Sequence, residues 1–270
     1  MTKKEFAEIE RYMLSQMRDS AHDRHHVYRV LNAAIDIYED IFEKNSLINT
    51  DAPAVDFDVL VAACLLHDIG REKQMNDPDK LNHAKIGSKM AYEYLLSRKW
   101  TEPKAAHVKA CISSHRYRGK KRPESIEAKI LYDADKLDAC GALGIARTLI
   151  YGGQVSEPLY IIGDGGTIAA DSGGRGVAEG GGRGVAEGEN IVAGGGDLIV
   201  TDGGGTEVSS FMQEYNYKLK KVYDSFYTER ARVIALERRK TAVDFYNDLY
   251  AEIADNYKNG ISSHMKYFRE

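Results

Sequence analysis

The sequence predicts an all-α fold that is interrupted by one glycine-rich insertion. Three observations favour this fold class. Apolar residues recur at helical spacing over about residues 4–18, an unbroken apolar run fills residues 59–66, and apolar positions again step by three and four after about residue 209. Candidate strands occur only inside the insertion, at residues 190–193 and 197–201, where they could form a β-hairpin.

Length, composition and charge are those of an ordinary globular protein. The chain has 270 residues, 43% hydrophobic and 29% charged, and its formal net charge at pH 7 is −4. This balance gives no bulk electrostatic signal for nucleic acid or an anionic membrane. Because no apolar run approaches the roughly 20 residues that span a bilayer, and no leader-like segment opens the chain, we expect a cytoplasmic protein.

The first two expected helices are amphipathic. Residues 4–18 place Phe6, Ile9, Met13 and Met17 on one face, which indicates a packing element. The next helix carries its polar residues on neighbouring turns, namely His22, His25, His26 and Arg29. One face could thus present imidazole and guanidinium together, although a solvated polar face would explain the same pattern.

The apolar run of residues 59–70, VLVAACLLHDIG, predicts a buried helix that ends in His67-Asp68. Burying a charged carboxylate costs several kcal/mol unless the group is paired or bound to metal. Imidazole beside carboxylate is a familiar ligand pair for a divalent cation. For the dipeptide alone, a capping ion pair is the simpler interpretation.

Further histidines and carboxylates occur where other expected helices begin or end. His83 follows Asn82 at the start of one helix, and His115 ends the next, before a basic stretch of residues 116–122. The helix predicted for residues 124–137 ends in a run of carboxylates that includes Asp135. Cys64, Cys111 and Cys140 are widely spaced within apolar patterns, so we expect buried free thiols.

The segment of residues 163–205 differs in kind, because it holds 17 of the 25 glycines. The octapeptide GGRGVAEG occurs there twice without a change, at residues 173–180 and 181–188. Such composition leaves backbone entropy high and core-forming side chains few. We interpret it as an insertion in a single domain of residues 1–270, with C-terminal helices over residues 209–258 that pack on the core.

Six of these residues together form a candidate metal site. They are His26, His67, Asp68, His83, His115 and Asp135. Four neutral imidazoles and two carboxylates could bind one or two divalent cations, and a bridging carboxylate is what two metals about 3.5–4 Å apart require. Mn, Fe, Mg and Ni are not distinguished by this donor set.

Five motifs resemble the HD superfamily of metal-dependent phosphohydrolases, in particular its bacterial branch related to nucleotide pyrophosphohydrolases. They are H-x-x-R-V at residues 26–30, LLHDIG at 65–70, NHA at 82–84, SHRYR at 114–118 and DADKLDA at 133–139. The resemblance covers about residues 20–155. Arg71, where some HD phosphodiesterases have lysine, and the glycine-rich insertion depart from the pattern.

The resemblance implies an all-α HD-domain helical bundle. It also implies His26, His67, Asp68 and Asp135 as the core metal ligands, with Asp68 bridging if His83 and His115 hold a second ion. The implied activity is hydrolysis of a phosphoester or phosphoanhydride by metal-activated water, with a phosphorylated small molecule, a nucleotide, as substrate.

Basic and acidic residues adjacent to the proposed ligands supply the remaining chemistry. Expected substrate-binding residues are Arg29, Arg116, Arg118 and Lys136. Expected catalytic residues are Arg71, Glu72, Lys73 and Asp138, of which Glu72 or Asp138 could accept a proton.

Two other function classes stay open at this point. One is a mixed-valent di-iron HD-fold oxygenase, which uses the same six ligands, and the other is a non-catalytic nucleotide-binding module. A homo-oligomer is also left open.

Overall fold

The computed structural model describes residues 1–17, 24–48, 54–75, 82–116, 121–161, 210–265 and 267. Within these ranges the regular structure is entirely helical, with no strand, which confirms the predicted fold class. The predicted insertion, including its candidate strands, lies outside the described residues. So does His22.

The chain divides into two compact units. The first comprises Met1–Asp138 with Phe226–Ala235, and the second comprises Ala139–Ser225 with Leu236–Glu270. The expectations of a single HD domain and of C-terminal helices packed on its core stay predictions.

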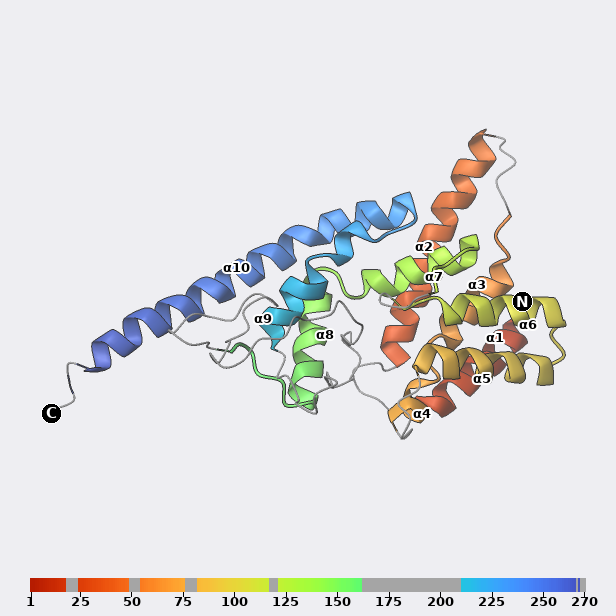
Figure 1. The fold of residues 1–270 in the computed structure, drawn as a ribbon. Coiled ribbons are helices and arrows are strands. Elements are labelled where there is room, and N and C mark those ends of the chain that lie inside the picture. Colours follow the sequence, from red (N-terminus) through yellow and green to blue (C-terminus); the bar gives the residue numbers. More distant parts are fainter. Residues whose placement is uncertain are drawn as a thin grey trace, which may run out of the picture. The chain divides into compact units, whose positions relative to one another are not determined.

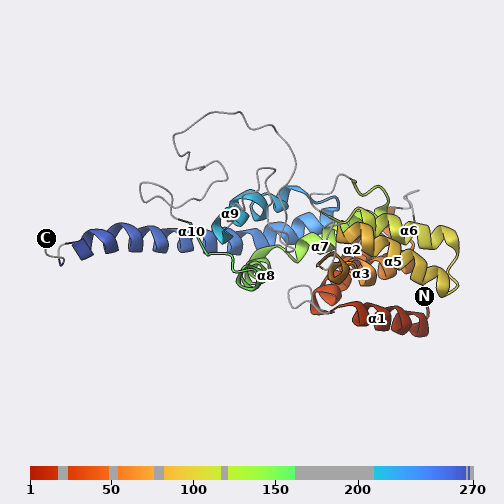
Figure 2. The same ribbon diagram turned by 60° about the horizontal axis from the view of Figure 1, so that its bottom comes forward.

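Seven helices of the first unit precede its C-terminal piece in the chain. They are α1 (Lys3–Gln16), α2 (Arg24–Ile48), α3 (Phe57–Leu66), α4 (Arg71–Met75), α5 (His83–Ser97), α6 (Glu102–Ser113) and α7 (Ile126–Leu137). Helix α3 packs against α1, α2, α6 and α7, and α5 lies side by side with α6 (Figure 1). Figure 2 shows α1 along one side of this bundle. Helix α3 therefore forms the centre of the unit.

Helix α3 is buried on every face from Val59 onward, as its sequence predicts. Each residue from Val59 to Leu66 is at most 4% exposed. Asp56 starts the helix, because its carboxylate accepts hydrogen bonds from the backbone N–H groups of Asp58 and Val59. The helix ends at Leu66, and the His67-Asp68 pair follows directly.

Side-chain caps also fix where α5 and α7 begin. Asn82 accepts a hydrogen bond from the backbone N–H of Ala84, so His83 becomes the first residue of α5. Ser125 accepts one from Ala128, and α7 therefore begins at Ile126 rather than at the predicted residue 124. Thr101 occupies the N-cap position of α6 but makes no capping hydrogen bond with its side chain.

A buried carboxylate attaches the start of α10 (Glu229–Met265) to α7. Asp133 accepts hydrogen bonds from the backbone N–H of Tyr227 at 2.9 Å and from the backbone N–H of Thr228 at 2.6 Å. The Thr228 hydroxyl donates a third, at 2.7 Å. The first acidic residue of DADKLDA thus caps a helix that is distant in sequence.

The second unit contains α8 (Gly141–Gln154), α9 (Phe211–Glu214), a π-helical turn η1 (Tyr215–Leu219), a 3₁₀ turn η2 (Val222–Asp224) and the later part of α10. The spacing of apolar residues after about residue 209 predicts two long helices. The second is present as α10, but the first is broken into short pieces. Ring stacking of Tyr215 on Tyr246, with centroids 3.9 Å apart, accompanies the break.

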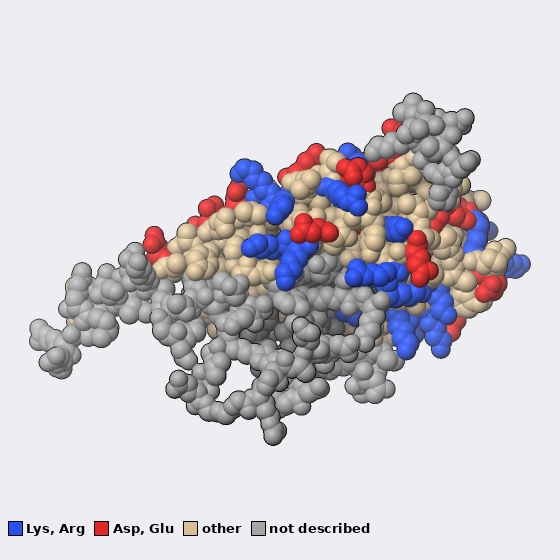
Figure 3. Space-filling model, turned by 45° about the horizontal axis from the view of Figure 1, so that its top comes forward, with Lys and Arg blue, Asp and Glu red and all other residues tan. Residues whose placement is uncertain are grey.

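The cysteines, the surface charges and the lengths of the helices can be compared with what the composition predicts. The thiols of Cys64, Cys111 and Cys140 are free and buried, as predicted. Basic and acidic side chains are interspersed on the face drawn in Figure 3. Among the described helices, none combines the length and apolarity that crossing a bilayer requires.

Candidate metal centre

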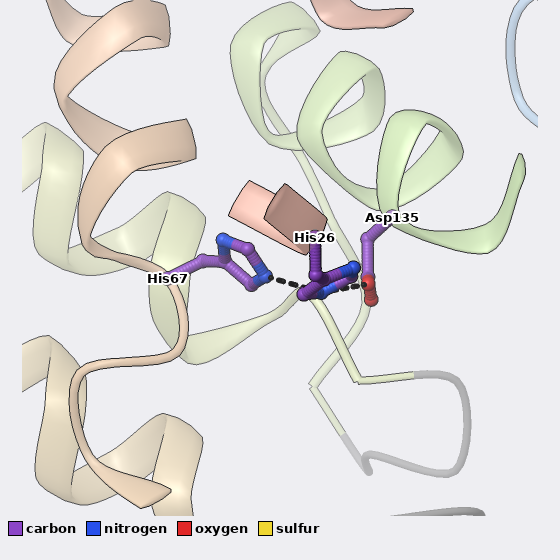
Figure 4. A group of neighbouring side chains, drawn as sticks. All are labelled: His26, His67 and Asp135. Atoms are coloured by element: carbon purple, nitrogen blue, oxygen red, sulfur yellow. Dashed lines mark hydrogen bonds and ion pairs between the residues drawn. The ribbon is translucent and has the colours of Figure 1, made fainter. Parts of the chain in front are cut away.

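The first group of donors comes from three helices of the bundle. His26 lies in the first turn of α2, His67 directly follows α3, and Asp135 lies near the end of α7. Figure 4 shows the His26 ring between the other two side chains. The Nε2 atom of His26 is 3.2 Å from His67 Nε2 and 3.5 Å from Asp135 Oδ1. We call these residues the first trio.

The second group of donors surrounds the other side of Asp68. His83 begins α5, and His115 follows the end of α6. Their Nε2 atoms are 3.7 Å and 3.6 Å from Asp68 Oδ1. Asp68, His83 and His115 form the second trio.

The two trios meet at Asp68. Its Oδ2 atom is 3.5 Å from Nε2 of both His26 and His67, whereas its Oδ1 atom faces His83 and His115. Within each trio, one donor atom per residue lies within 4.8 Å of the others, and the described residues contain no other such group of His, Cys, Asp or Glu. A carboxylate that directs one oxygen to each group has the arrangement expected of a bridging ligand.

Two orphaned polar atoms test whether the site fits a cation. Asp68 Oδ1 and His83 Nε2 are buried, and neither has a hydrogen-bond partner within the described part of the chain. Leaving a buried acceptor unsatisfied costs about 1–3 kcal/mol, and more for a charged group. A divalent cation between these atoms would satisfy both, so the donor set fits a metal.

The far nitrogen of each imidazole has an oxygen partner. His67 Nδ1 lies 2.8 Å from the carbonyl oxygen of Cys64, and His115 Nδ1 lies 2.6 Å from that of Ile112. An oxygen without a proton can only accept, so each Nδ1 carries a proton, and in the neutral ring each Nε2 keeps its lone pair. This is the usual orientation of metal-binding histidines.

The remaining two imidazoles use side chains for the same purpose. His26 Nδ1 lies 2.7 Å from Asp138 Oδ2, and His83 Nδ1 lies 3.0 Å from Oε1 of Gln74. All four Nε2 atoms therefore point to the same centre, toward Asp68.

Burial and neighbouring charges keep the donors of the second trio in their metal-binding forms. Burial lowers the pKa of His115, and burial together with the nearby Arg71 charge holds the pKa of His83 well below its ordinary value. Burial alone would raise the pKa of Asp68, but the charge of Arg71 opposes it, and that pKa lies well below the usual range. The second trio thus contains neutral imidazoles and an ionised carboxylate.

Cationic side chains lie directly beside both carboxylate ligands. Arg71 Nε donates to Asp68 Oδ2 at 2.7 Å, and Lys136 Nζ donates to Asp135 Oδ2 at 2.6 Å. Burial favours the neutral form of Asp135, but Lys136 outweighs it, so the pKa of this carboxyl is also well below its usual range. Arg71 and Lys136 are thus placed next to the centre.

The other predicted residues are more dispersed. Arg29 Nε donates to Asp138 Oδ1 at 2.7 Å, so the two form a pair behind His26. Arg116 is half-buried and close enough for its charge to contribute to the lowered pKa of His83. Glu72 is half-buried and Lys73 is exposed on α4. Arg118 lies outside the described residues.

A backbone contact brings α5 close enough to complete the second trio. A Cβ atom built on Gly70 would lie 2.3 Å from the carbonyl oxygen of His83 and 2.5 Å from the backbone nitrogen of Gly87. Only glycine fits such an approach. Gly70 therefore lets the start of α5 reach the turn that carries Asp68.

Sequence reasoning missed the residues that orient the imidazoles. It gave Gln74 no role, and it considered Asp138 only as a proton acceptor. The carbonyl partners leave no trace in the sequence, because every residue supplies one. The spacing of Gln74, six residues after Asp68, carries no recognisable signal either.

Comparisons with known proteins agree with this geometry. The HD domain family model matches residues 24–140, a range that contains all six donors. The uncharacterized protein YpgQ of Bacillus subtilis is 34% identical over 163 residues, which are 58% of this chain and 71% of YpgQ.

Solved structures share the fold. A Lactobacillus plantarum protein has a TM-score of 0.63 at 22% identity, with 93% of this chain and 98% of that chain covered. YpgQ in complex with ADP has a TM-score of 0.57 at 23% identity, with 92% and 97% covered. A protein described as a predicted HD superfamily hydrolase, from an uncultured Thermotogales bacterium, has a TM-score of 0.51 at 25% identity, with 93% and 92% covered.

The match of the family model includes the helices that carry the two trios, and the chain covers 71% of YpgQ at 34% identity. The chain belongs to the HD domain family.

Proposed function

We propose that this protein is a metal-dependent phosphohydrolase that cleaves a phosphoester or phosphoanhydride bond of a nucleotide. The observation that carries the proposal is the division of Asp68 between two donor trios, with Oδ2 facing His26 and His67 and Oδ1 facing His83 and His115. Membership of the HD domain family supports hydrolysis, and the ADP complex of the related YpgQ supports a nucleotide.

The six donors would hold two divalent cations, with His26, His67 and Asp135 on one side of Asp68 and His83 and His115 on the other. Cations bound in this way act as Lewis acids on phosphoryl oxygens and lower the pKa of bound water from about 15.7 to about 7. This donor chemistry suits phosphoryl transfer to water. Mn²⁺ is our first choice for reconstitution, although the donor set does not select it over Fe²⁺, Mg²⁺ or Ni²⁺.

Arg71 and Lys136 would bind the phosphate group of the substrate. Each donates to a carboxylate of the proposed centre, so their positive charges lie beside it and would attract the negative charge of a phosphate. Arginine can also hold two phosphate oxygens at once. We further assign Arg116, whose charge acts on His83, to substrate binding on the side of the second trio.

The pair of Asp138 and Arg29 would act through His26 rather than on the substrate. Oδ1 of Asp138 accepts from Arg29 Nε, and Oδ2 accepts from His26 Nδ1. With both oxygens occupied, Asp138 suits orientation of His26 better than acceptance of a proton. Among the residues considered, this leaves Glu72 as the remaining candidate for the general base.

Metal analysis paired with a substrate panel tests the proposal. The purified protein, stripped and reloaded separately with Mn²⁺, Fe²⁺, Mg²⁺ and Ni²⁺, would be offered a phosphomonoester, a cyclic phosphodiester, and nucleoside di- and triphosphates. We expect about two cations per chain and release of phosphate or pyrophosphate from a nucleotide. The matched control is Lys89→Gln, which removes a side chain that is 74% exposed on α5 and should change neither result.

The other outcomes decide between the remaining classes. Tightly held iron without hydrolysis of any phosphate would contradict the proposal and favour the di-iron oxygenase. Nucleotide binding without turnover by the metal-loaded protein would favour the non-catalytic module.

A further inference from the structure

The four imidazoles of the centre differ in what their Nδ1 atoms contact. Three of these partners can only accept a hydrogen bond, namely the carbonyl oxygens of Cys64 and Ile112 and the carboxylate of Asp138. The fourth partner is the side-chain amide of Gln74, beside His83. An amide offers an oxygen that accepts and an NH₂ group that donates.

This difference determines how firmly each tautomer is fixed. A carbonyl or carboxylate partner requires a proton on Nδ1, and in the neutral imidazole this leaves Nε2 with the lone pair that binds a cation. An amide can satisfy either tautomer by turning over. His83 is consequently the one imidazole of the four whose tautomer depends on the orientation of a neighbouring side chain.

The contacts around His83 identify the orientation present. Gln74 is 8% exposed, and its Oε1 atom lies 3.0 Å from His83 Nδ1, so Nδ1 donates. On the other side of the ring, Nε2 lies 3.7 Å from Asp68 Oδ1, too far for a hydrogen bond, and both atoms are orphaned. The amide thus holds His83 with its Nε2 lone pair toward the position between His83 and Asp68.

We propose that Gln74 is a positioning residue that sets the affinity of the second trio for its cation, by holding His83 in the tautomer that can ligate. The inference rests on the proposed two-cation centre but concerns a residue outside the donor set. Gln74 is not one of the six donors, and in this proposal it acts through its contact with His83. The first trio, whose imidazoles have partners that only accept, is independent of it.

Two near-isosteric substitutions separate this role from simple packing. Gln74→Glu keeps the shape and supplies a carboxylate that accepts from His83 Nδ1. Gln74→Leu keeps most of the volume and removes the acceptor. An orienting partner of a metal ligand contributes about 10–100-fold in metal affinity. We therefore expect Gln74→Leu to weaken binding of the second cation by about 10–100-fold, and Gln74→Glu to bind it at least as tightly as the wild type.

The experiment is a titration of metal-free full-length protein with Mn²⁺ by calorimetry, followed by electron paramagnetic resonance, in which a coupled Mn²⁺ pair is distinguishable from a single ion. Wild type, both Gln74 variants and the exposed-site control Lys89→Gln would be compared. Circular dichroism would check that each is folded. The first binding step should keep its wild-type affinity throughout, and the coupled signal should be lost at low Mn²⁺ only in Gln74→Leu.

Several results would overturn the inference. One is a Gln74→Leu variant that binds the second Mn²⁺ as tightly as the wild type does. Another is equal weakening of this binding in both variants, which would show that only packing matters. If Gln74→Leu does not fold, the test uses Gln74→Glu alone. A folded Gln74→Glu variant that does not bind the second Mn²⁺ would also overturn the inference. A wild-type protein that binds no Mn²⁺ at all would instead refute the proposed function, which makes the two failures distinguishable.

Discussion

The two trios use similar donors but are built in different ways. The first trio comes from α2, the end of α3 and α7, three helices that pack directly on one another in the core of their unit. The second trio takes His83 from the first residue of α5 and His115 from just beyond α6. Its donors thus depend on where helices start and stop, and on how the α5–α6 pair approaches α3.

This contrast indicates that the first trio is the more rigid. Its histidines have partners that only accept, and its helices share a core. The second trio depends on the Gln74 amide and on a close contact at Gly70. We expect the two cations to bind in sequence, with the first trio occupied at lower metal concentration.

The largest effect should follow from replacing the residue that the trios share. Asp68→Ala removes one oxygen from each side, so we expect loss of both cations and of turnover, whereas the helical content measured by circular dichroism remains. His67→Ala should also abolish turnover and prevent retention of the first cation. Wild-type metal content and rate in either variant would show that the central assignment is wrong.

Local signals in the sequence indicate these residues as candidate donors, and the structure brings them together in two groups. The apolar run before His67 indicated a buried helix, and that helix is buried on all faces. Asn82 before His83 indicated a helix start, and the cap is present. What binds the far side of each imidazole was not predictable, since it depends on three-dimensional contacts such as that between His26 and Asp138, 112 positions apart.

A smaller effect is expected from removing a donor of the second trio alone. His115→Ala should reduce the metal content from about two to about one per chain and affect activity far more than stability, because the first trio remains intact. Metal analysis and urea unfolding of the same preparation measure both quantities. A metal content of one in both wild type and variant, with only a raised KM, would assign His115 to substrate binding.

The helix boundaries after residue 209 were less predictable, because the spacing of apolar residues does not show where a helix breaks. Apolar residues from Phe211 to Phe226 keep helical spacing, yet that segment contains α9, η1 and η2 in succession. A π-helical turn changes the register without changing which residues are apolar. Periodicity therefore predicted the buried residues, such as Phe211 and Val222, but not the breaks between the short helices.

The backbone contact that positions α5 can be tested with one methyl group. Gly70→Ala would place a Cβ atom 2.3 Å from the His83 carbonyl oxygen, so we expect a loss of about 1–3 kcal/mol in the free energy of unfolding and a weakened second trio. Gly153→Ala is the matched control, because a Cβ there meets nothing within 4 Å. Because Gly153 lies in helix α8, Gly153→Ala should raise the free energy of unfolding by up to about 1 kcal/mol. Equal urea midpoints for the two variants would contradict the close approach.

The smallest effect should follow from changing the residue that orients the first trio. Asp138→Asn keeps an oxygen that can accept from His26 Nδ1 but removes the negative charge that makes the imidazole a stronger ligand and pairs with Arg29. We expect the affinity of the first cation to fall by about tenfold, near the lower limit for orienting partners of metal ligands. Calorimetric titration with Mn²⁺ measures this change.

The same variant separates the two roles considered for Asp138. If it orients His26, activity lost in Asp138→Asn should return when Mn²⁺ is supplied well above its dissociation constant, and the pH profile of kcat should keep its wild-type shape. If Asp138 is the proton acceptor, excess Mn²⁺ cannot restore activity, because the missing group takes part in the chemical step, and the acidic limb of the profile should disappear. Because both carboxylate oxygens of Asp138 already accept hydrogen bonds in the core of the unit, we expect rescue by metal.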